Sequence, residues 1–338
     1  MKALVTGGNG FLGSAIVRML AARGDQVCIL CRSGHSAAFS STLAKHRSPL
    51  LVQADIRDAT AVQKACEGQD VVFHVAAKAG FWGRRHEFQS TNVDGTRNVI
   101  KACRAAGVSR LVYTSSPSVV FGRDDLSGVN ESQPYPLHYL ADYPESKARA
   151  ERMVLAANGA SLSTVALRPH LIFGPGDPHL IPRVIDRARK GTLRQVGEGK
   201  NLVDITYIDN AAEAHLLAAD AVSPDASCAG KPFFITQGEP VVLWTWLDEL
   251  LQAVKAPRIT RGVSLRTATL VGAVMEGVHR AFGLEREPRM TRFLANQLAK
   301  SHYFDISAAK RDLGYTVRVS LREGTNRLIE WLRRFPNA

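Results

Sequence analysis

The chain has 338 residues, more than twice the ~150 of a typical domain, so it can form one large domain or two fused lobes. Hydrophobic residues make up 45% of the chain and charged residues 22%, a globular composition that excludes a disordered, collagen-like or coiled-coil protein. The formal net charge is +12. Residues 255–300 hold nine Lys or Arg and three acids, so half of this excess lies in one late segment.

This basic segment is interleaved with apolar residues, which fits an anionic membrane surface or an anionic, apolar ligand better than a nucleic acid. The chain has no groove-reading motif, and we expect no nucleic-acid partner. A solvated basic face on a helix that packs into the core is the alternative. Peripheral contact with a membrane, contact with a partner enzyme and assembly into a homodimer all stay open.

No apolar run approaches the ~20 residues needed to cross a bilayer, and Met1–Thr6 lead into a glycine-rich turn, not into a cleavage site. We therefore expect a cytoplasmic protein, with membrane association as the alternative. The five cysteines are expected to be reduced core residues, with Cys28 and Cys31 on opposite faces of a buried strand. The ten histidines show no metal-ligand spacing, so we predict no metal site.

Short apolar strands alternate with helical segments along the first half of the chain. The expected strands are Ala3–Thr6, Val27–Cys31, Leu50–Gln53, Asp70–His74, Arg110–Thr114 and Thr164–Leu167. This rhythm predicts an α/β fold: a Rossmann-type doubly wound parallel sheet with a smaller C-terminal substrate lobe. We place the nucleotide-binding domain at 1–172 and a mainly substrate-binding lobe at 173–338, with part of 200–220 returning to the first. Later strands are expected near Val203–Ile208 and Phe233–Thr236.

A glycine-rich turn follows the first expected strand. Gly8, Gly10 and Gly13 have the spacing G-x-G-x-x-G, and a helical pattern follows from Ser14 to Arg23. Glycines are needed there for a tight turn, for close approach of backbone N–H groups to a pyrophosphate and for packing of the helix on the strand. We therefore expect a dinucleotide to bind at Gly7, Asn9, Gly10, Phe11, Leu12 and Gly13.

The ends of the second and third strands indicate which dinucleotide binds. A carboxylate at the end of the second strand holds the ribose of NAD, whereas a cation there accommodates the 2′-phosphate of NADP. This chain has Arg32 and Ser33 at that position and no acid, which favours NADP(H); an exposed Arg32 without a ligand is the alternative. Asp55 and Ile56, after the third strand, are placed to meet the adenine.

Tyr143 is the one tyrosine with a lysine four residues later. On a helix, Tyr143 and Lys147 share a face, so the ammonium can lower the pKa of the phenol and can also reach a ribose. Upstream, Thr114–Ser118 forms a hydroxyl cluster at the end of a strand, where doubly wound sheets bind ligands. A tyrosine that transfers a proton, a lysine that tunes it and a serine that holds a carbonyl oxygen indicate hydride transfer beside a nicotinamide.

Several neighbouring residues have two interpretations. The small side chains of Ala76 and Ala77 would let the cofactor approach the backbone. Phe81 and Trp82 either wall an apolar pocket or lie on an ordinary surface loop. His170 either faces the nicotinamide or acts as a spacer.

In these motifs the sequence resembles the extended short-chain dehydrogenase/reductase family over nearly the whole chain, and within it the 3β-hydroxysteroid dehydrogenase branch. The motifs stand in the family's order: Val5–Gly13, His74–Ala77, Asn92–Thr96, Tyr113–Val119, Tyr143 with Lys147, Arg168-Pro169 and Phe173–Gly176. Within that branch the chain is similar to the ketoreductases of bacterial long-chain olefin biosynthesis, which reduce 2-alkyl-3-oxoalkanoic acids with NADPH.

The resemblance implies roles for individual residues. Ser116, Tyr143 and Lys147 are the implied catalytic residues, and further cofactor contacts are implied at Ala76, Ala77, Lys78, Tyr143, Lys147 and Pro169. The implied activity is NADP(H)-dependent reduction of a long-chain 2-alkyl-3-oxoalkanoic acid, or of a similar apolar 3-keto substrate, to the 3-hydroxy compound. The expected partner is an apolar small molecule that carries a carboxylate.

Rival functions stay open. A 3β-hydroxysteroid or sterol dehydrogenase would use the same chemistry in the opposite direction. A sugar-nucleotide epimerase is disfavoured, because an alignment on Val120-Phe121-Gly122 puts Pro117 where the carbonyl-binding hydroxyl belongs, and a dehydratase is disfavoured because Pro117-Ser118 supplies no general acid or base. A non-catalytic NADP-sensing protein would need neither Tyr143 nor Lys147.

The last expectation concerns the segment from Ser264 to Met290. Its apolar residues recur every four positions, at Leu270, Val274, Val278 and Phe282, and its net charge is positive. We expect this segment to shape the entrance for an acyl chain and to rest on a membrane or a partner enzyme. A helix whose apolar stripe packs only against its own lobe is the alternative.

Overall fold

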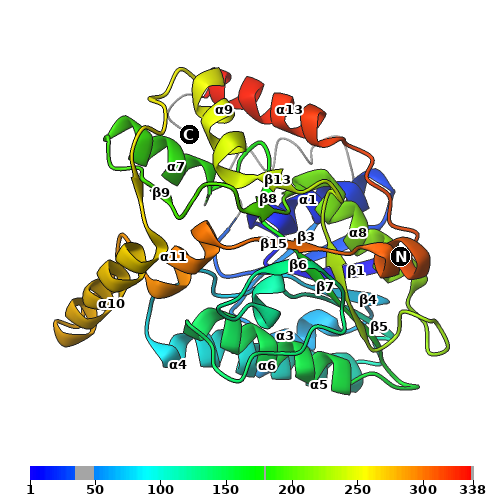
Figure 1. Cartoon of the computed structure of the whole chain (residues 1–338). Coiled ribbons are helices and arrows are strands. Elements are labelled where there is room, and N and C mark those ends of the chain that lie inside the picture. Colours follow the sequence, from blue (N-terminus) through cyan, green and yellow to red (C-terminus); the bar gives the residue numbers. More distant parts are fainter. Residues whose placement is uncertain (35–48, 179, 336–338) are drawn as a thin grey trace.

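A sheet of seven parallel strands forms the centre of the molecule, in the order β12-β7-β5-β4-β1-β2-β3 (Figure 1). The structure is a computed structural model and describes residues 1–34, 49–178 and 180–335. The strands are β1 (Lys2–Thr6), β2 (Gln26–Cys31), β3 (Leu50–Gln53), β4 (Val71–His74), β5 (Arg110–Thr114), β7 (Ser163–Pro169) and β12 (Lys231–Ile235). The order reverses between β1 and β4, and ligands bind at such switch points in doubly wound sheets. The expected Rossmann-type sheet is confirmed.

Helices cover both faces of this sheet. One face carries α3 (Ala59–Cys66), α5 (Gly95–Ala105) and α6 (Asp142–Ala156), and the other carries α1 (Phe11–Ala22) and α8 (Ile208–Ala221) (Figure 1). Side chains of β1 alternate between the two layers, because successive residues of a strand point to opposite faces: Leu4 belongs to one apolar cluster, and Ala3 and Val5 to the other. Cys28 and Cys31 divide in the same way, as expected, and all five cysteines are buried and free.

Two late segments differ from the simple strand pattern of the sequence. The strand expected near Phe233–Thr236 is β12, which the sequence did not place in the central sheet, where it pairs with β7. The stretch expected near Val203–Ile208 is divided between β10 (Leu202–Val203) and β11 (Thr206–Tyr207), and Ile208 already begins α8. The division arises because β10 pairs with β13 and β15, whereas β11 pairs with β8 in a different sheet.

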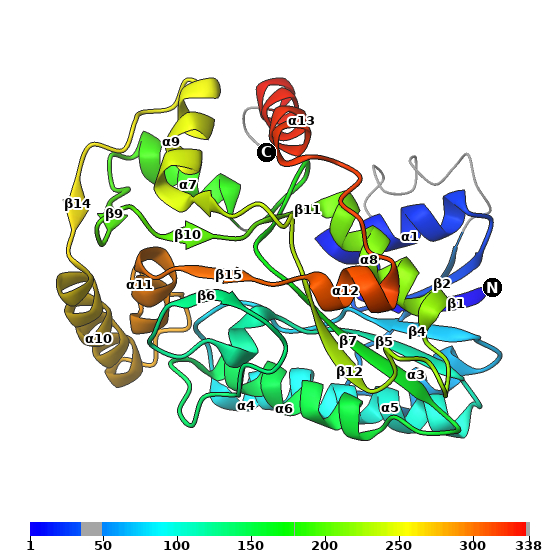
Figure 2. The same cartoon turned by 45° about the vertical axis from the view of Figure 1, so that its right-hand side comes forward.

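The remaining elements lie beside the carboxyl ends of the central strands or in the connections between them (Figure 2). A small sheet has the order β13-β10-β15-β6, and β14 pairs with β9. The further strands are β6 (Leu126–Val129), β8 (Ile172–Phe173), β9 (Gln195–Val196), β13 (Val241–Val242), β14 (Gly262–Val263) and β15 (His302–Phe304). The further helices are α4 (Arg85–Phe88), η1 (Gln89–Asp94), η2 (Pro117–Val120), α7 (Ile181–Arg189), α9 (Leu243–Ala253), α10 (Leu265–Ala281), α11 (Arg292–Ala299), α12 (Ser307–Leu313) and α13 (Leu321–Arg334). No helix among the described residues is long and apolar enough to cross a membrane.

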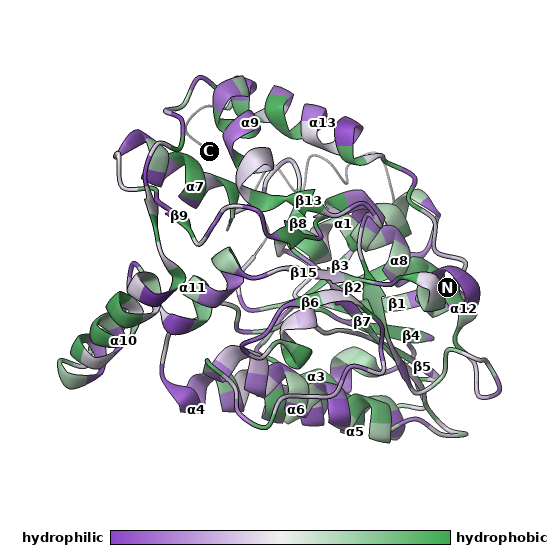
Figure 3. Ribbon diagram, viewed as in Figure 1, coloured by the Kyte–Doolittle hydropathy of each residue, from purple (hydrophilic) through white to green (hydrophobic). Residues whose placement is uncertain are grey.

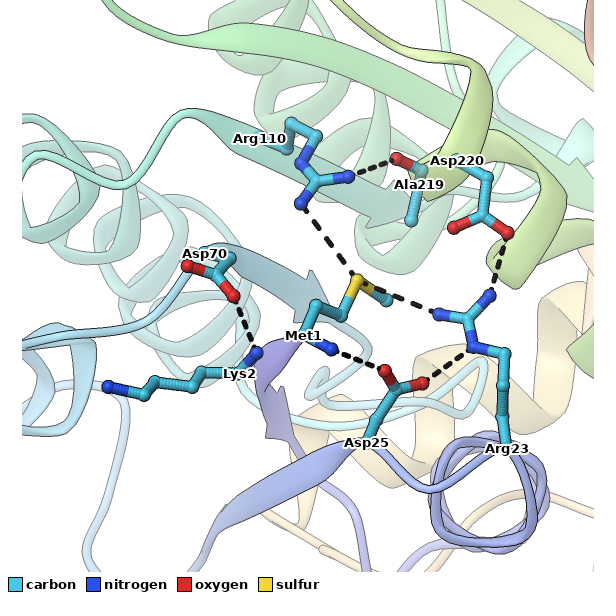
Figure 4. Close-up of polar contacts among 8 residues, drawn as sticks. All are labelled: Met1, Lys2, Arg23, Asp25, Asp70, Arg110, Ala219 and Asp220. Atoms are coloured by element: carbon cyan, nitrogen blue, oxygen red, sulfur yellow. Dashed lines mark hydrogen bonds and ion pairs between the residues drawn. The ribbon is translucent and has the colours of Figure 1, made fainter.

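A polar cluster joins the end of α8 to the amino-terminal ends of β1 and β2 (Figure 4). The Met1 ammonium and the Arg23 guanidinium both bind the Asp25 carboxylate, at 2.6 Å each, and Arg23 also binds Asp220 at the end of α8, at 2.7 Å. Burial raises the pKa of Asp25, but the two cations outweigh burial and hold that pKa below its usual value. Residues 208–221 are therefore tied to the first lobe, although they come late in the chain.

Candidate active site

The turn after β1 is so tight that there is no room for a side chain at Gly7 or Gly13. A Cβ added at Gly13 would lie 2.2 Å from the carbonyl oxygen of Gly7, and one at Gly7 would lie 2.9 Å from the Cα of Ala76. Gly7 also has a φ of 70°, in the left-handed region that favours glycine. The turn leads into the N-terminus of α1, whose first turn holds no acid, so its positive end can receive an anion. These residues fit a dinucleotide pyrophosphate.

The ends of β2 and β3 bring the expected adenosine-binding residues together. The Asn9 side chain donates to the Ser33 carbonyl oxygen, at 3.1 Å, and so joins the glycine turn to the end of β2. Arg32 and Ser33 are both exposed there. The Asp55 carboxylate is bound by both arms of Arg57, and this contact is the main reason that the pKa of Asp55 lies below its usual value. Arg57 is a second cation at this edge, in addition to Arg32, and no sequence motif indicated it.

His74, at the end of β4, is a buried core histidine. Its Nδ1 lies 2.8 Å from the Thr6 hydroxyl and its Nε2 lies 3.0 Å from the Thr96 hydroxyl. Burial, with the nearby positive charge of Lys147, lowers the pKa of His74 to about 3, so the ring is neutral at physiological pH. The Ala76 backbone N–H donates to the same Thr6 hydroxyl, at 3.2 Å, which holds the chain close to the glycine turn.

Asn92 joins the loop after β4 to α6, and the sequence analysis did not place it in the site. Its side-chain oxygen accepts a hydrogen bond from the Lys78 N–H, at 2.7 Å. Its side-chain nitrogen donates to the Lys78 carbonyl, at 3.1 Å, and to the Ser146 hydroxyl, at 2.9 Å. Asn92 lies in the π-helix η1, a rare geometry that often occurs at functional sites. Its contacts fix the loop at Lys78 against the helix that carries Tyr143.

Lys147 is a buried residue of α6 that contacts the end of β5. Its ammonium donates to the Thr114 carbonyl, at 2.5 Å, and lies 4.2 Å from the centre of the Tyr113 ring. Burial lowers the pKa of Lys147 to about 7, and the negative charge of Glu151 offsets part of that effect. Glu151, one turn later, forms a buried ion pair with Arg168 of β7 at 2.6 Å.

Tyr143 and Ser116 lie next to each other. The expectation that Lys147 lowers the pKa of the Tyr143 phenol is wrong. Burial raises the pKa of the Tyr143 phenol, and the group that lowers it in part is the Ser116 hydroxyl, not Lys147. Tyr143 is therefore protonated at neutral pH. The Ser116 hydroxyl lies 2.9 Å from that of Ser118 and caps the short helix η2. The expected roles of Ser116, Tyr143 and Lys147 stay predictions.

A row of aromatic rings from distant parts of the chain begins at the Tyr143 side chain. The Phe81 ring lies edge-on to Tyr143, with 6.3 Å between ring centres, and 4.8 Å from the ring of Phe293 on α11. Phe293 also lies 6.0 Å from Phe121. No role for Phe121 or Phe293 was predicted from the sequence, because only the folded chain joins them to Tyr143 through Phe81.

His170 follows β7 directly and is engaged by a second histidine. Its Nε2 lies 2.6 Å from Nδ1 of His302, whose Nε2 donates to the Gln297 carbonyl. Because that carbonyl only accepts, His302 Nδ1 carries no proton and accepts one from His170. Burial lowers the pKa of His302 to about 4 and that of His170 well below its ordinary value, so both rings are neutral.

The described residues hold no group of three or more His, Cys, Asp or Glu side chains placed to bind a metal ion. What the site does offer is a backbone cradle for a pyrophosphate, a protonated tyrosine beside a serine, and an aromatic wall. This arrangement can bind a dinucleotide and protonate the oxygen of an apolar carbonyl compound.

Comparisons with known proteins agree with this chemistry. A model of the 3-beta hydroxysteroid dehydrogenase/isomerase family matches residues 4–261. The chain belongs to this family. It is 48% identical to a 2-alkyl-3-oxoalkanoate reductase of Stenotrophomonas maltophilia, over 97% of this chain and 98% of that protein. It is 35% identical to a decarboxylating sterol-4-alpha-carboxylate 3-dehydrogenase of Mus musculus, over 97% of this chain and 90% of that protein.

These likenesses confirm the resemblance seen in the sequence and the expectation that the chain is an oxidoreductase. Among solved structures, a dTDP-glucose 4,6-dehydratase from Streptomyces venezuelae with NAD bound is 26% identical, with a TM-score of 0.77 over 98% of this chain and 97% of that one. This neighbour and the glycine turn support a nicotinamide dinucleotide as the cofactor.

A pH dependence of dinucleotide binding follows from the burial of Lys147. Because the pKa of Lys147 is about 7, the ammonium is lost as the pH rises through that value. A ribose or phosphate that needs the ammonium will then bind more weakly, by up to about tenfold for each pH unit above 7. We expect titration calorimetry with NADPH from pH 6 to pH 9 to show this loss in the wild type and not in Lys147→Met. Equal pH profiles for the two proteins would contradict the assignment.

Proposed function

We propose that this chain reduces the 3-keto group of a long-chain 2-alkyl-3-oxoalkanoic acid, or of a similarly apolar substrate, to the 3-hydroxy compound with NADP(H). The observation that carries the proposal is the buried Tyr143, kept protonated beside Ser116 and edge-on to Phe81. A protonated phenol is a proton donor, which is what reduction of a carbonyl requires. In the reverse reaction the same phenol would accept the proton, so we assign the direction from the substrate class of the relative with 48% identity.

When bound, the dihydronicotinamide supplies a hydride for the carbonyl carbon. The Ser116 hydroxyl holds the carbonyl oxygen, and Tyr143 gives that oxygen its phenolic proton as negative charge develops on it. Lys147 positions the phenol from the next turn of α6 and holds a ribose hydroxyl. Ala76, Ala77, Lys78 and Pro169 line the cofactor from the ends of β4 and β7 in this assignment.

The aromatic lining supports an apolar substrate. Phe81, Phe121 and Phe293 form a continuous chain of ring contacts that begins at Tyr143. Each methylene group removed from water against such a wall contributes about 0.8 kcal/mol, so alkyl chains gain affinity there. The relative with 48% identity bears the name of a reductase of this substrate class. Sugar-nucleotide dehydration is disfavoured, because Pro117-Ser118 provides no acid or base after Ser116.

Oxidation of a 3β-hydroxysterol is the second candidate, favoured by the 35% identity to a sterol 3-dehydrogenase. Both candidates use the same residues and differ in the shape of the substrate and in the direction of hydride transfer. Under either one, we assign cofactor binding to residues 1–172 with the returning segment, and substrate binding mainly to 173–338. A cytoplasmic location and a place in olefin biosynthesis stay predictions.

The preference for NADP(H) is proposed from Arg32. Arg32 and Ser33 are exposed at the end of β2, with the second cation Arg57 nearby on Asp55, so a 2′-phosphate would meet positive charge there. We expect Arg32→Asp to lower the preference for NADPH over NADH at least about tenfold, because a charge-assisted hydrogen bond to a phosphate contributes roughly 1.5–3 kcal/mol. Steady-state kinetics with both dinucleotides measure the ratio. A wild type that already favours NADH would refute the proposal.

The reaction is tested with a panel of substrates and a tyrosine variant. Purified protein with NADPH should turn over a long-chain 2-alkyl-3-oxo acid with a kcat/KM far above that for a 3-ketosteroid or a sugar nucleotide. Tyr143→Phe should keep the fold and NADPH binding but lower kcat about 10²–10⁴-fold, the usual contribution of a general acid. Circular dichroism and calorimetry serve as controls for folding and binding.

One result would count against the proposed substrate and another against the proposed mechanism. Preferred turnover of the 3-ketosteroid would favour the sterol dehydrogenase. Near-normal turnover by Tyr143→Phe with the oxo acid would leave the reaction in place but remove Tyr143 as its proton donor.

A further inference from the structure

Helix α10 projects from the body of the molecule (Figures 1 and 2). Its large apolar side chains are exposed. Leu270 is 66% exposed, Val274 58% and Phe282, which caps the helix, 77%. Val271, Val278 and Leu284 extend the same exposed face. Figure 3 shows bands of hydrophobic residues along this projecting helix. The alternative in which this stripe packs only against its own lobe is therefore wrong.

The residues of α10 that are buried against the rest of the molecule are small or acidic. Gly272 lies so close to α11 that an added Cβ would be 2.7 Å from the carbonyl carbon of Thr291. Glu276 is buried there, accepts from the Arg292 N–H at 2.7 Å and forms an ion pair with its guanidinium at 2.8 Å. The helix is thus attached through Ala268, Gly272 and Glu276, and the exposed side chains of Leu270, Val274 and Val278 are left for another surface. A contiguous exposed apolar face of this kind marks an interaction site.

The charges around this face are positive and available. The acids of the segment are all paired: Glu276 with Arg292, Glu285 with Arg84 and Glu287 with Arg183. By contrast Arg266, Arg286 and Arg289 are exposed and form no ion pair with any residue that the structure describes. The exposed apolar side chains therefore lie beside three free guanidinium groups.

The exposed face leads to the candidate active site through two aromatic residues. The Trp82 indole N–H donates to the Leu284 carbonyl at 3.0 Å, and the Trp82 ring packs edge-on against His279 of α10, with 5.7 Å between ring centres. The next residue back, Phe81, is the ring that lies against Tyr143. Trp82 and Phe81 thus connect α10 to Tyr143 through a short series of side-chain contacts.

We propose that the exposed face of α10, with residues 282–289, docks on the surface of a bilayer that contains anionic lipids. Apolar side chains enter the interface between headgroups and acyl chains, and nearby arginines bind the headgroups. A symmetric contact with a second copy of the chain would place the free arginines of both copies close together, and like charges would oppose it. The docking goes beyond the proposed reaction and does not depend on it, since binding is measured without turnover.

Cosedimentation of the full chain with vesicles tests the docking. We expect binding to vesicles of phosphatidylglycerol and phosphatidylcholine in equal amounts, and much weaker binding to phosphatidylcholine alone. Val274→Asp/Val278→Asp should lower the partition coefficient at least about tenfold, because both side chains enter the interface and neither is part of the core. Arg266→Gln, Arg286→Gln and Arg289→Gln should each lower it about fivefold at low ionic strength.

A matched control separates this face from exposed apolar surface in general. Leu137 is 96% exposed and lies outside α10, so Leu137→Asp should leave vesicle binding unchanged. Thermal melting of each variant should match the wild type, because the changed side chains are exposed.

Three outcomes would overturn the proposal. One is no cosedimentation with either vesicle, and another is equal binding to both vesicles with no effect of the arginine changes. The third is a dimer or a complex with another protein that Val274→Asp/Val278→Asp abolishes while vesicle binding stays unchanged. Variants that lose vesicle binding but turn over a soluble substrate at the normal rate would show that the docking and the reaction are independent.

Discussion

Helix α6 buries two opposite charges one turn apart, those of Lys147 and Glu151. The position of the active site depends on the partners that the fold provides for them. The Lys147 ammonium binds the last carbonyl of β5, and the Glu151 carboxylate binds Arg168 of β7 and the Tyr135 hydroxyl. A buried charge without a partner is costly, so each contact holds α6 in one register against the sheet. That register places Tyr143, one turn before Lys147, at the carboxyl end of β5 beside Ser116. The same burial lowers the pKa of Lys147 and raises that of Tyr143, so the phenol keeps its proton at neutral pH.

The site is completed from both lobes. The first lobe supplies the glycine turn, the serine and the tyrosine on a rigid sheet, and Asn92 ties the loop at Lys78 to Ser146 of α6. The second lobe contributes Phe293, whose helix α11 also carries the contacts that attach α10. The apolar wall near Tyr143 and the exposed helix therefore share one support, which links substrate entry to the surface that we assign to lipid.

The sequence predicted those parts of the fold and site that depend on local spacing. The glycines at 7, 10 and 13 and the pair Tyr143/Lys147 are separated by a few residues, so helix and turn geometry alone bring them together. Phe121 and Phe293 are 172 positions apart in the printed sequence, and only tertiary packing makes them neighbours. The direction of the Tyr143 pKa shift was wrongly predicted, because spacing does not show burial, which raises that pKa, and Lys147 does not lower it. Periodicity also showed that α10 has an apolar stripe but not that the stripe faces solvent, since periodicity does not say what covers a face.

The central claim is that a hydride reaches the keto carbon of an apolar 3-oxo acid at this site. A single-turnover experiment with NADPH deuterated on the transferred position of C4, a long-chain 2-alkyl-3-oxo acid and excess protein tests it most directly. Mass spectrometry of the product should show one deuterium on carbon 3 of the 3-hydroxy acid, bound to carbon and not exchanged with water. A product without deuterium, or no oxidation of the dinucleotide while a sugar nucleotide is converted under the same conditions, would contradict the account.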